Sequence, residues 1–283
     1  MTNASNAQQI EYWNGPVGER WARLQERIDL HLADITAAAL PFASPAPDER
    51  LLDIGCGCGT TTFLLAMEAG REGATAGIDI SGPMLDVARG RAMAQNANVT
   101  FIQADASDYE FQPVFDLVFS RFGIMFFADP VRAFANLRKA LAPAGRLVFA
   151  CWRSLAENPW AADPMAAALH LLPPQESTDP FAPGPFAFAE IQRVRAILAD
   201  AGYGQITVQP FDGTMNMGAS LEEAAAETLN VGPLARAATD LDEQTRDRIR
   251  KAVEKAYAKY SSPAGVTPPA ACWFVRARSR EAL

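Results

Sequence analysis

Short apolar runs alternate with helix-like segments between Leu51 and Trp152, and this alternation constrains the fold more than any other feature of the chain. Apolar positions at helical spacing follow several of the runs. The runs read as strands, and they are LLDI, ATAGIDI, NVTFIQA, FDLVFS and LVFACW. They are apolar on both faces instead of alternating, so they predict a parallel sheet that is covered by helices on both sides.

The pattern loosens after Trp152, and two further strand-like runs, QITVQPF and CWFVRA, appear near the C-terminus. Before the sheet, the spacing predicts one helix over residues 17–41, ended by Pro41. We therefore divide the chain into four parts. They are an N-terminal helical lid (1–47), a cofactor-binding core (48–152), an insert over the substrate side (153–189), and a segment that completes the core (190–283) and carries a helical insert (213–265).

Charge and composition exclude several classes of partner. The 283-residue chain has a formal net charge of -8 and a pI of about 4.9, so it repels phosphate backbones, and we expect no nucleic-acid partner. We see no signal core and no apolar stretch long enough for a bilayer, so we expect a cytoplasmic protein without a membrane partner. The spacing of Cys56, Cys58, Cys151 and Cys272 suits neither a disulfide framework nor a metal site. A homodimer is left open.

A glycine-rich turn follows the first strand-like run. It reads Asp53-Ile54-Gly55-Cys56-Gly57-Cys58-Gly59, and glycines at alternate positions allow a tight turn and close approach of a ligand to the backbone. A dinucleotide fingerprint needs a third glycine at position 60, where Thr60 stands. The turn therefore predicts a nucleotide-like cofactor and disfavours a nicotinamide oxidoreductase.

Carboxylates end three successive strand-like runs. Asp79 lies about 20 residues beyond the glycines, where an acidic residue accepts hydrogen bonds from ribose hydroxyls. Asp53 precedes the glycines and Asp105 ends the third run, so we expect all three to converge at the carboxyl edge of the sheet. Such a cluster repels a diphosphate and attracts a ligand that carries a sulfonium and an ammonium group.

The successive motifs DIGCGCG, GIDIS, QADAS, FDLVFSRFGIMFF and LAPAGRLVFACW resemble those of class I S-adenosylmethionine-dependent methyltransferases, in the ubiquinone-biosynthesis-like branch. The resemblance covers roughly residues 48–152. It implies an α/β, Rossmann-like fold, which we expect as a seven-stranded, mostly parallel sheet with an antiparallel last strand. It also implies S-adenosyl-L-methionine as cofactor and S-adenosyl-L-homocysteine as product.

The same resemblance implies which residues bind the cofactor. Asp79 would hold the ribose, Asp105 would accept from the adenine amino group, and Ser120 would act through its carbonyl. Trp13 and Trp21 are either a lid over the cofactor or packing residues of an amphipathic helix. The full predicted set is Asp53, Gly55, Cys56, Gly57, Asp79, Ile80, Met84, Asp105, Ala106, Ser120, Trp13 and Trp21.

No catalytic constellation is apparent. The fourth run lacks the Asn/Asp-Pro-Pro-Tyr signature of amino-directed nucleic-acid and protein methyltransferases, and an in-line displacement mainly requires positioning. Arg121, His31 and His170 are the only weak candidates for a catalytic role.

We expect a small, apolar or aromatic acceptor, methylated at oxygen, nitrogen, sulfur or carbon. The predicted substrate-binding residues are Arg121, Phe126, Trp152 and Phe186. A nucleic-acid or protein methyltransferase, or a cofactor-binding protein without catalysis, remains the alternative.

Overall fold

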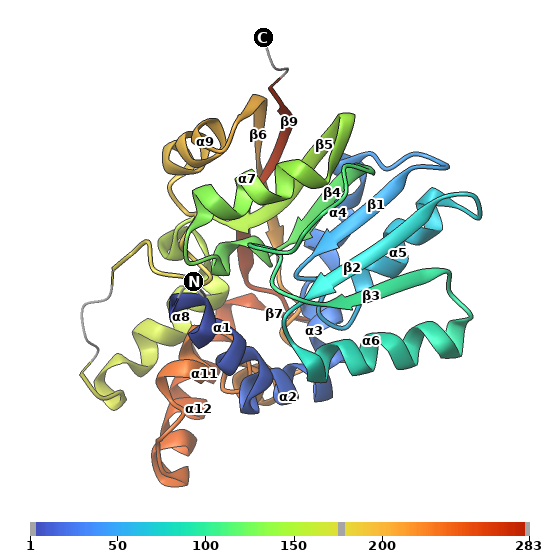
Figure 1. Cartoon of the computed structure of the whole chain (residues 1–283). Helices are drawn as coiled ribbons and strands as arrows, with labels where there is room; N and C mark the ends of the chain where they lie inside the picture. Colours follow the sequence, from blue (N-terminus) through green and yellow to red (C-terminus); the bar gives the residue numbers. More distant parts are fainter. Residues whose placement is uncertain (1–3, 175–178, 281–283) are drawn as a thin grey trace.

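The computed structural model describes residues 4–174 and 179–280, and its centre is one seven-stranded sheet (Figure 1). The order is β3 (Val99–Gln103), β2 (Ala74–Asp79), β1 (Arg50–Ile54), β4 (Phe115–Arg121), β5 (Leu141–Trp152), β9 (Pro269–Ser279) and β6 (Tyr203–Thr214). Only β9 is antiparallel to its neighbours in this sheet. The predicted mostly parallel sheet with an antiparallel last strand is confirmed.

Helices cover both faces of the sheet, as the apolar strands require. Helices α5 (Thr60–Ala69) and α6 (Gly82–Gln95) connect β1 to β2 and β2 to β3. On the other face, α7 (Pro130–Ala140) packs against α9 (Ile191–Asp200). Helix α4 (Ala33–Ala43) lies on the face opposite α7. Phe42 of α4 contacts Phe274 of β9, and Phe134 of α7 contacts Phe149 of β5. The register of β5 and β9 places Phe274 and Phe149 on opposite faces of the sheet.

Seven further helices lie at or near the edge where the parallel strands end (Figure 1). They precede β1 or follow β5 or β6, and four 3₁₀ turns and a hairpin of two short strands accompany them. The helices are α1 (Ala4–Asn14), α2 (Pro16–Arg23), α3 (Gln25–His31), α8 (Pro159–Ala168), α10 (Leu221–Thr228), α11 (Pro233–Ala237) and α12 (Glu243–Tyr257). The turns are η1 (Ile124–Phe126), η2 (Leu155–Glu157), η3 (Leu169–Leu171) and η4 (Ala258–Tyr260), and β7 (Ser261–Ser262) pairs with β8 (Gly265–Val266).

The prediction of one helix over 17–41 is wrong. The chain forms α2, α3 and α4, with Leu24 and Leu32 between them at φ near -97° and -98° and ψ near 16° and 6°. These bridge-region angles bend the chain so that it follows the rim of the sheet. Pro41 does not end the helix but lies in the last turn of α4, which continues to Ala43.

One strand is longer than the run LVFACW predicts. The stretch APAGR, which comes directly before that run, also belongs to β5, with an irregular register between the Phe115–Leu141 and Leu117–Arg146 pairs. Residues 1–3, 175–178 and 281–283 of the four predicted parts lie outside the described residues. Among the described helices, none combines the length and the apolar character needed to cross a membrane.

Arg146 joins the N-terminal helices to the sheet. Its guanidinium pairs with Glu49 at 2.6 and 2.9 Å and donates to the carbonyls of Ala43 at 3.1 Å and Ser44 at 2.5 Å. The residue is only 9% exposed, so these charge-assisted bonds form in a poorly solvated place, where the loss of one partner is costly.

We expect Arg146→Ala to lower the free energy of unfolding by about 3 kcal/mol, because it leaves Glu49 without its cationic partner and removes the donor to two helix-end carbonyls. Urea unfolding at neutral pH measures the change. The matched control is Arg278→Ala, since Arg278 is the register partner of Arg146 on β9 but is exposed, and its removal should cost under about 0.5 kcal/mol. Equal costs for the two variants would contradict this role of Arg146.

Candidate active site

A cavity of about 220 Å³ lies at the carboxyl edge of the sheet, beneath the helices that gather there. Its walls come from the loops after β1, β2, β3 and β4, from the end of β5, and from the lid helices α1 to α3. This is the edge at which open parallel sheets bind ligands. The predicted residues that line it are Gly55, Cys56, Gly57, Asp79, Ile80, Met84, Asp105, Ala106, Trp13, Trp21, Arg121, Phe126, Trp152 and His31.

The glycine turn after β1 adopts left-handed backbone angles, with φ of 64° at Gly55 and 53° at Gly57. A Cβ at Gly55 would lie 2.6 Å from Cα of Gly123, so a side chain at that position has no space. A Cβ at Gly57 would meet only Sδ of Met84, at 3.7 Å. The need for glycine at position 57 therefore comes from its backbone conformation, with packing adding little.

Asp79 ends β2 and holds the glycine turn in place. One carboxylate oxygen accepts from the Gly57 N–H and the other from the Ser81 N–H, both at 2.8 Å. Burial raises the pKa of Asp79, and these two N–H groups oppose the rise. Each oxygen keeps further acceptor capacity, so a ligand hydroxyl in the cavity can still bind to this carboxylate.

Asp105 lines the cavity beyond the end of β3. Its carboxylate accepts from the Ser107 N–H at 2.8 Å and from the side-chain amide of Asn6 in α1. The same amide donates to the Ser107 hydroxyl at 2.7 Å. Helix α1, which the sequence analysis did not predict, thus rests directly on the carboxylate expected to meet the adenine.

Asp53 does not line the cavity. It is fully buried behind the glycine turn, where one oxygen accepts from the hydroxyls of Thr61 and Thr62 at 2.7 Å each. The other oxygen has no hydrogen-bond partner among the described residues. Burial raises the pKa of Asp53 to about 6, against the effect of the two threonines. The expected convergence of three strand-end carboxylates in one cavity is therefore not what the structure shows.

The third carboxylate of the cavity comes from Asp29 on α3. It accepts from the Thr60 hydroxyl at 2.6 Å and from Gln25, and it lies 3.6 Å from the guanidinium of Arg91. These contacts tie the lid to the start of α5. Asp29 could not be predicted from the sequence, because an acidic residue on a helix usually belongs to a solvated face.

Trp13 and Trp21 line the cavity and also pack against each other. Their rings meet edge to face with centroids 5.4 Å apart. Trp13 also meets Phe126 at 5.3 Å, and its carbonyl accepts from the Ser81 hydroxyl at 2.7 Å. The side chain of Asn14 bonds the Ile80 carbonyl and the Gly82 N–H, both at 2.9 Å, so α1 is anchored on the loop after β2.

The part of the cavity formed by Phe122, Trp152, Trp160 and the adjacent Arg121 is called its aromatic end below. The guanidinium donates to the Thr36 hydroxyl at 2.6 Å, its Nε has no partner, and no carboxylate within the described residues lies within ion-pair distance. Burial lowers the pKa of Arg121, although the charges of Asp29 and Asp53 oppose this. Arginine does not lose its proton in proteins, so this end holds a cation that has no ion-pair partner among the described residues.

Phe122, which the sequence analysis missed, follows Arg121 with φ of 67°. A phenylalanine rarely adopts this angle, and such strain gathers at functional sites. Its ring stacks on that of Trp152 at 4.1 Å with an interplanar angle of 7°. Both rings line the cavity. The sequence offered one sign that Phe122 belongs to the site, its position between an apolar strand-like run and Gly123.

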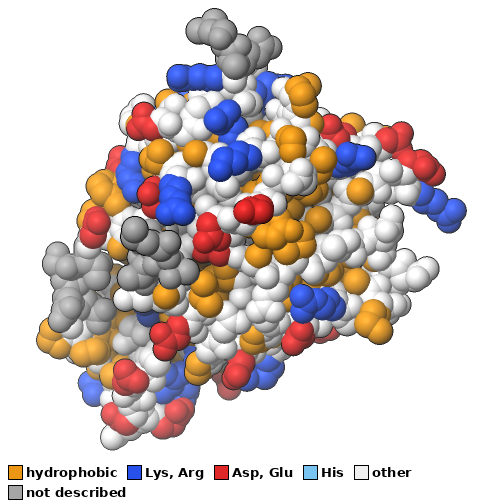
Figure 2. Space-filling model, viewed as in Figure 1, with side chains coloured by type: hydrophobic (Ala, Val, Ile, Leu, Met, Phe, Trp, Pro, Cys, Tyr) orange, Lys and Arg blue, Asp and Glu red, His pale blue; other side chains and the backbone are white. Residues whose placement is uncertain are grey.

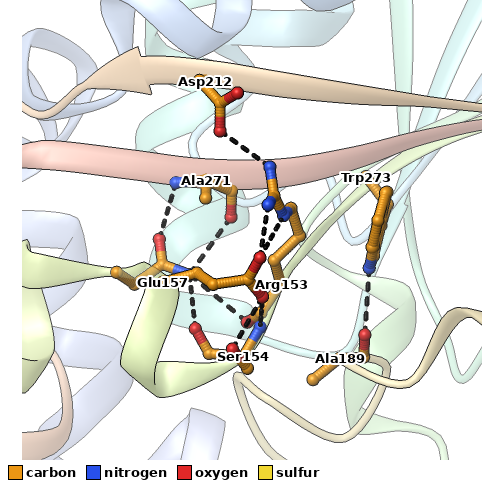
Figure 3. Close-up of polar contacts among 8 residues, drawn as sticks. Arg153, Ser154, Glu157, Ala189, Asp212, Ala271 and Trp273 are labelled. Carbon is orange, nitrogen blue, oxygen red and sulfur yellow. Dashed lines mark hydrogen bonds and ion pairs between the residues drawn. The ribbon is translucent and has the colours of Figure 1, made fainter.

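Ser120 and Phe186, like Asp53, are predicted residues that lie outside the cavity lining. Ser120 is fully buried, and its hydroxyl donates to the Ile54 carbonyl at 2.8 Å and accepts from the Gly123 N–H at 3.2 Å. Phe186 packs half-buried against the hydrophobic core, and its neighbour Pro185 lines the cavity. Arg153 follows the predicted substrate residue Trp152 in the sequence. Its guanidinium pairs with Glu157 and Asp212 outside the cavity lining (Figure 3).

The two histidines occupy different environments. His31 lines the cavity, is 4% exposed, and has no hydrogen-bond partner in the part of the chain that the structure describes. Burial, reinforced by the charge of Arg27, lowers its pKa to about 4, so the ring is neutral at pH 7. His170 is exposed on η3 and does not line the cavity, so nothing in its position favours a catalytic role.

Comparison with known proteins matches residues 45–182 to a methyltransferase domain family. The matched region covers slightly less than half of the chain. Aklanonic acid methyltransferase of Streptomyces is 36% identical over 110 residues, and demethylmenaquinone methyltransferase of Thermus thermophilus is 38% identical over 112 residues. These matches cover 38% and 39% of the chain and 50% of each relative, so the chain spans about half the length of the curated relatives.

Solved structures show the same fold at low sequence identity. The YcgJ protein of Bacillus subtilis superimposes with a TM-score of 0.57 at 16% identity, over 87% of this chain and 98% of the other. Phosphoethanolamine N-methyltransferase 2 of Haemonchus contortus, solved with S-adenosyl-L-methionine, gives a TM-score of 0.53 at 22% identity, over 87% of this chain and 52% of the other.

The low pKa of His31 makes stability depend on pH. The native state binds a proton less readily than the unfolded chain, whose histidine pKa is 6.5, so stability is lost as the pH falls below 6.5. Between pH 7.5 and pH 5 this loss amounts to about 2 kcal/mol. From pH 7.5 to pH 5, the free energy of unfolding of His31→Gln should therefore fall by about 2 kcal/mol less than that of the parent protein. Urea unfolding at these two pH values measures the difference. His170→Gln is the control and should follow the parent; identical behaviour of His31→Gln and the parent would contradict the assignment.

Proposed function

We propose that this protein transfers a methyl group from S-adenosyl-L-methionine to a small molecule that binds in the aromatic end of the cavity. The observation that carries the proposal is one cavity, in a methyltransferase domain, with carboxylates at one end and an unpaired arginine among aromatic rings at the other. The carboxylate end suits the cofactor, and the aromatic end suits the acceptor.

The charges of the cavity support this cofactor. Asp29, Asp79 and Asp105 line it, and Arg121 is the one arginine or lysine in the lining within the described residues. A sulfonium and an ammonium group are attracted by such a lining, and a diphosphate is repelled. Asp79 would hold the ribose, Asp105 the adenine amino group, and the turn at Gly55 the methionine part.

When bound, the cofactor supplies a methyl group already activated by the sulfonium. The chain then has to exclude water and hold the acceptor atom behind that methyl group, and the lid helices and the aromatic rings serve both purposes. Burial raises the pKa of Cys58 to about 12 and that of Cys56 well above its usual value, so neither thiol is a nucleophile at neutral pH.

The aromatic end supports a small, apolar or aromatic acceptor. Phe122 and Trp152 supply flat apolar surfaces, and Arg121 can orient an anionic or carbonyl oxygen. An acceptor that binds as an anion needs no general base, which fits a site whose one histidine is neutral and without a partner. By name, two relatives act on aklanonic acid and on demethylmenaquinone, which are small molecules.

A nucleic-acid acceptor is the weaker candidate. On the face drawn in Figure 2, basic side chains are interspersed with acidic ones, and the chain carries a net charge of -8. A phosphate backbone binds best to a continuous basic surface.

The four cysteines are free thiols, which supports a reducing compartment such as the cytoplasm.

Asp79→Ala should weaken the binding of S-adenosyl-L-homocysteine at least tenfold, because it removes charge-assisted hydrogen bonds worth about 1.5–3 kcal/mol each. Calorimetric titration measures the dissociation constant. Asp86→Ala is the control, since Asp86 lies on the neighbouring helix α6 and pairs only with Arg89 at the surface. An unchanged dissociation constant for Asp79→Ala would overturn the assignment of the ribose site.

Arg121→Met should raise the KM for the acceptor by about ten- to a hundredfold, the equivalent of a charged hydrogen bond, while cofactor affinity stays within about twofold. A screen of small acceptors with labelled cofactor first identifies a methylated compound. Arg153→Met, which removes an arginine bound outside the cavity, should leave that KM unchanged. If Arg121→Met loses affinity for S-adenosyl-L-homocysteine instead, then Arg121 serves the cofactor.

A further inference from the structure

Trp160, at the start of α8, is held in place from several sides. It lines the aromatic end of the cavity and is 7% exposed. Its indole N–H donates to Oδ1 of Asn158 at 3.0 Å, and its carbonyl accepts from the hydroxyl of Tyr257 in α12 at 2.5 Å. Next to the ring stands Gly232 with φ of 99°, where a Cβ would approach Cζ3 of the indole to 3.2 Å. The ring can therefore shift very little.

Asn158 uses its whole side chain to hold this part of the structure, and it is fully buried. Its amide group donates to the carbonyls of Arg153 at 3.3 Å, Ser154 at 3.0 Å and Ala271 at 3.1 Å. Its Oδ1 accepts from the Ala271 N–H at 2.8 Å as well as from Trp160. Figure 3 shows this cluster, in which the end of β5, the turn η2 and strand β9 meet.

The ring that Asn158 holds is the last of three that form a continuous wall. The Trp160 and Trp152 rings lie 4.9 Å apart, and Trp152 in turn stacks on Phe122. All three line the cavity beside Arg121. A buried indole usually finds a partner for its N–H, so that bond alone would indicate only core packing. Here the restrained ring faces a cavity, at the end where the acceptor is proposed to bind.

We propose that Trp160 determines acceptor specificity and that Asn158 is a positioning residue that acts through it. The fixed indole extends the flat wall formed by Trp152 and Phe122. The part of the cavity in front of this wall, here called the slot, accepts a flat conjugated ring whose anionic oxygen reaches Arg121. A branched or saturated group of the same size makes less contact with the three rings. This inference rests on the proposed function, because it refines the acceptor end of the same cavity.

Calorimetry with 1-hydroxy-2-naphthoate, a flat bicyclic acid, tests the slot in protein saturated with S-adenosyl-L-homocysteine. We expect binding to the parent protein, weakened about tenfold in Trp160→Ala and about threefold in Trp160→Phe, since aromatic contacts of this kind are worth up to about a factor of ten. Trp273→Phe is the matched control. Trp273 also donates its indole N–H to a carbonyl, that of Ala189, but does not line the cavity, so this variant should bind within about twofold of the parent.

The outcomes separate the two proposals. Failure of the parent protein to bind S-adenosyl-L-homocysteine overturns the proposed function itself. Binding of S-adenosyl-L-homocysteine but not of the naphthoate overturns the slot alone, and so does naphthoate binding that Trp160→Ala leaves unchanged.

A double-mutant cycle tests the positioning role of Asn158. Asn158→Leu should weaken naphthoate binding about fivefold in the parent protein but under about twofold in the Trp160→Ala background, because its effect passes through the missing ring. A merely structural role would give equal effects in both backgrounds, and that result would overturn the positioning role. If Asn158→Leu does not fold, Trp160→Phe removes the same hydrogen bond from the other side, and unchanged naphthoate binding then counts against the role.

Discussion

The backbone contact between the turn after β1 and the turn after β4 is the constraint on which the site depends. Gly55 and Gly123 lie back to back, and a Cβ added to either would come within 2.6 Å of the other turn. The Ser120 hydroxyl joins the two turns, since it bonds both the Ile54 carbonyl and the Gly123 N–H. This contact brings the glycine turn beside Arg121, so the carboxylate end and the aromatic end become one cavity. It occurs at the centre of the sheet, where parallel strands diverge to either side.

Charge then divides this cavity into two ends. Asp79 and Asp105 are held by backbone N–H groups that fix their orientation while leaving acceptor capacity for a ligand. Among the described residues, Arg121 donates to a neutral hydroxyl and forms no ion pair, although the charges of Asp29 and Asp53 act on it. Under the proposed function, a ligand with a positive centre would be stabilised at one end and an acceptor with a negative oxygen at the other. The same arrangement would then orient the two molecules toward each other.

The sequence predicted what local patterns determine and missed what arises from packing. Seven strands, the glycine turn and the lining positions of Asp79 and Asp105 follow from apolar runs and fixed spacing within about fifty residues. Asp29 and Asn6 reach the same cavity from lid helices whose placement depends on tertiary contacts, and no spacing rule reports those. Phe186 was chosen for its aromatic character alone, and it packs into the core while its neighbour lines the cavity.

The match to a methyltransferase domain does not by itself identify the acceptor, because it includes residues from both ends of the cavity. The matched region ends at residue 182 and includes Asp79 and Asp105 as well as Arg121, Trp152 and Trp160. Segments on either side of it complete the cavity. His31 lies before the matched region, and Gly232 and Tyr257, which border or support Trp160, lie after it. The position of Trp160 therefore depends on contacts that the matched region alone does not supply, and the acceptor must be sought from the geometry around Arg121 and Trp160.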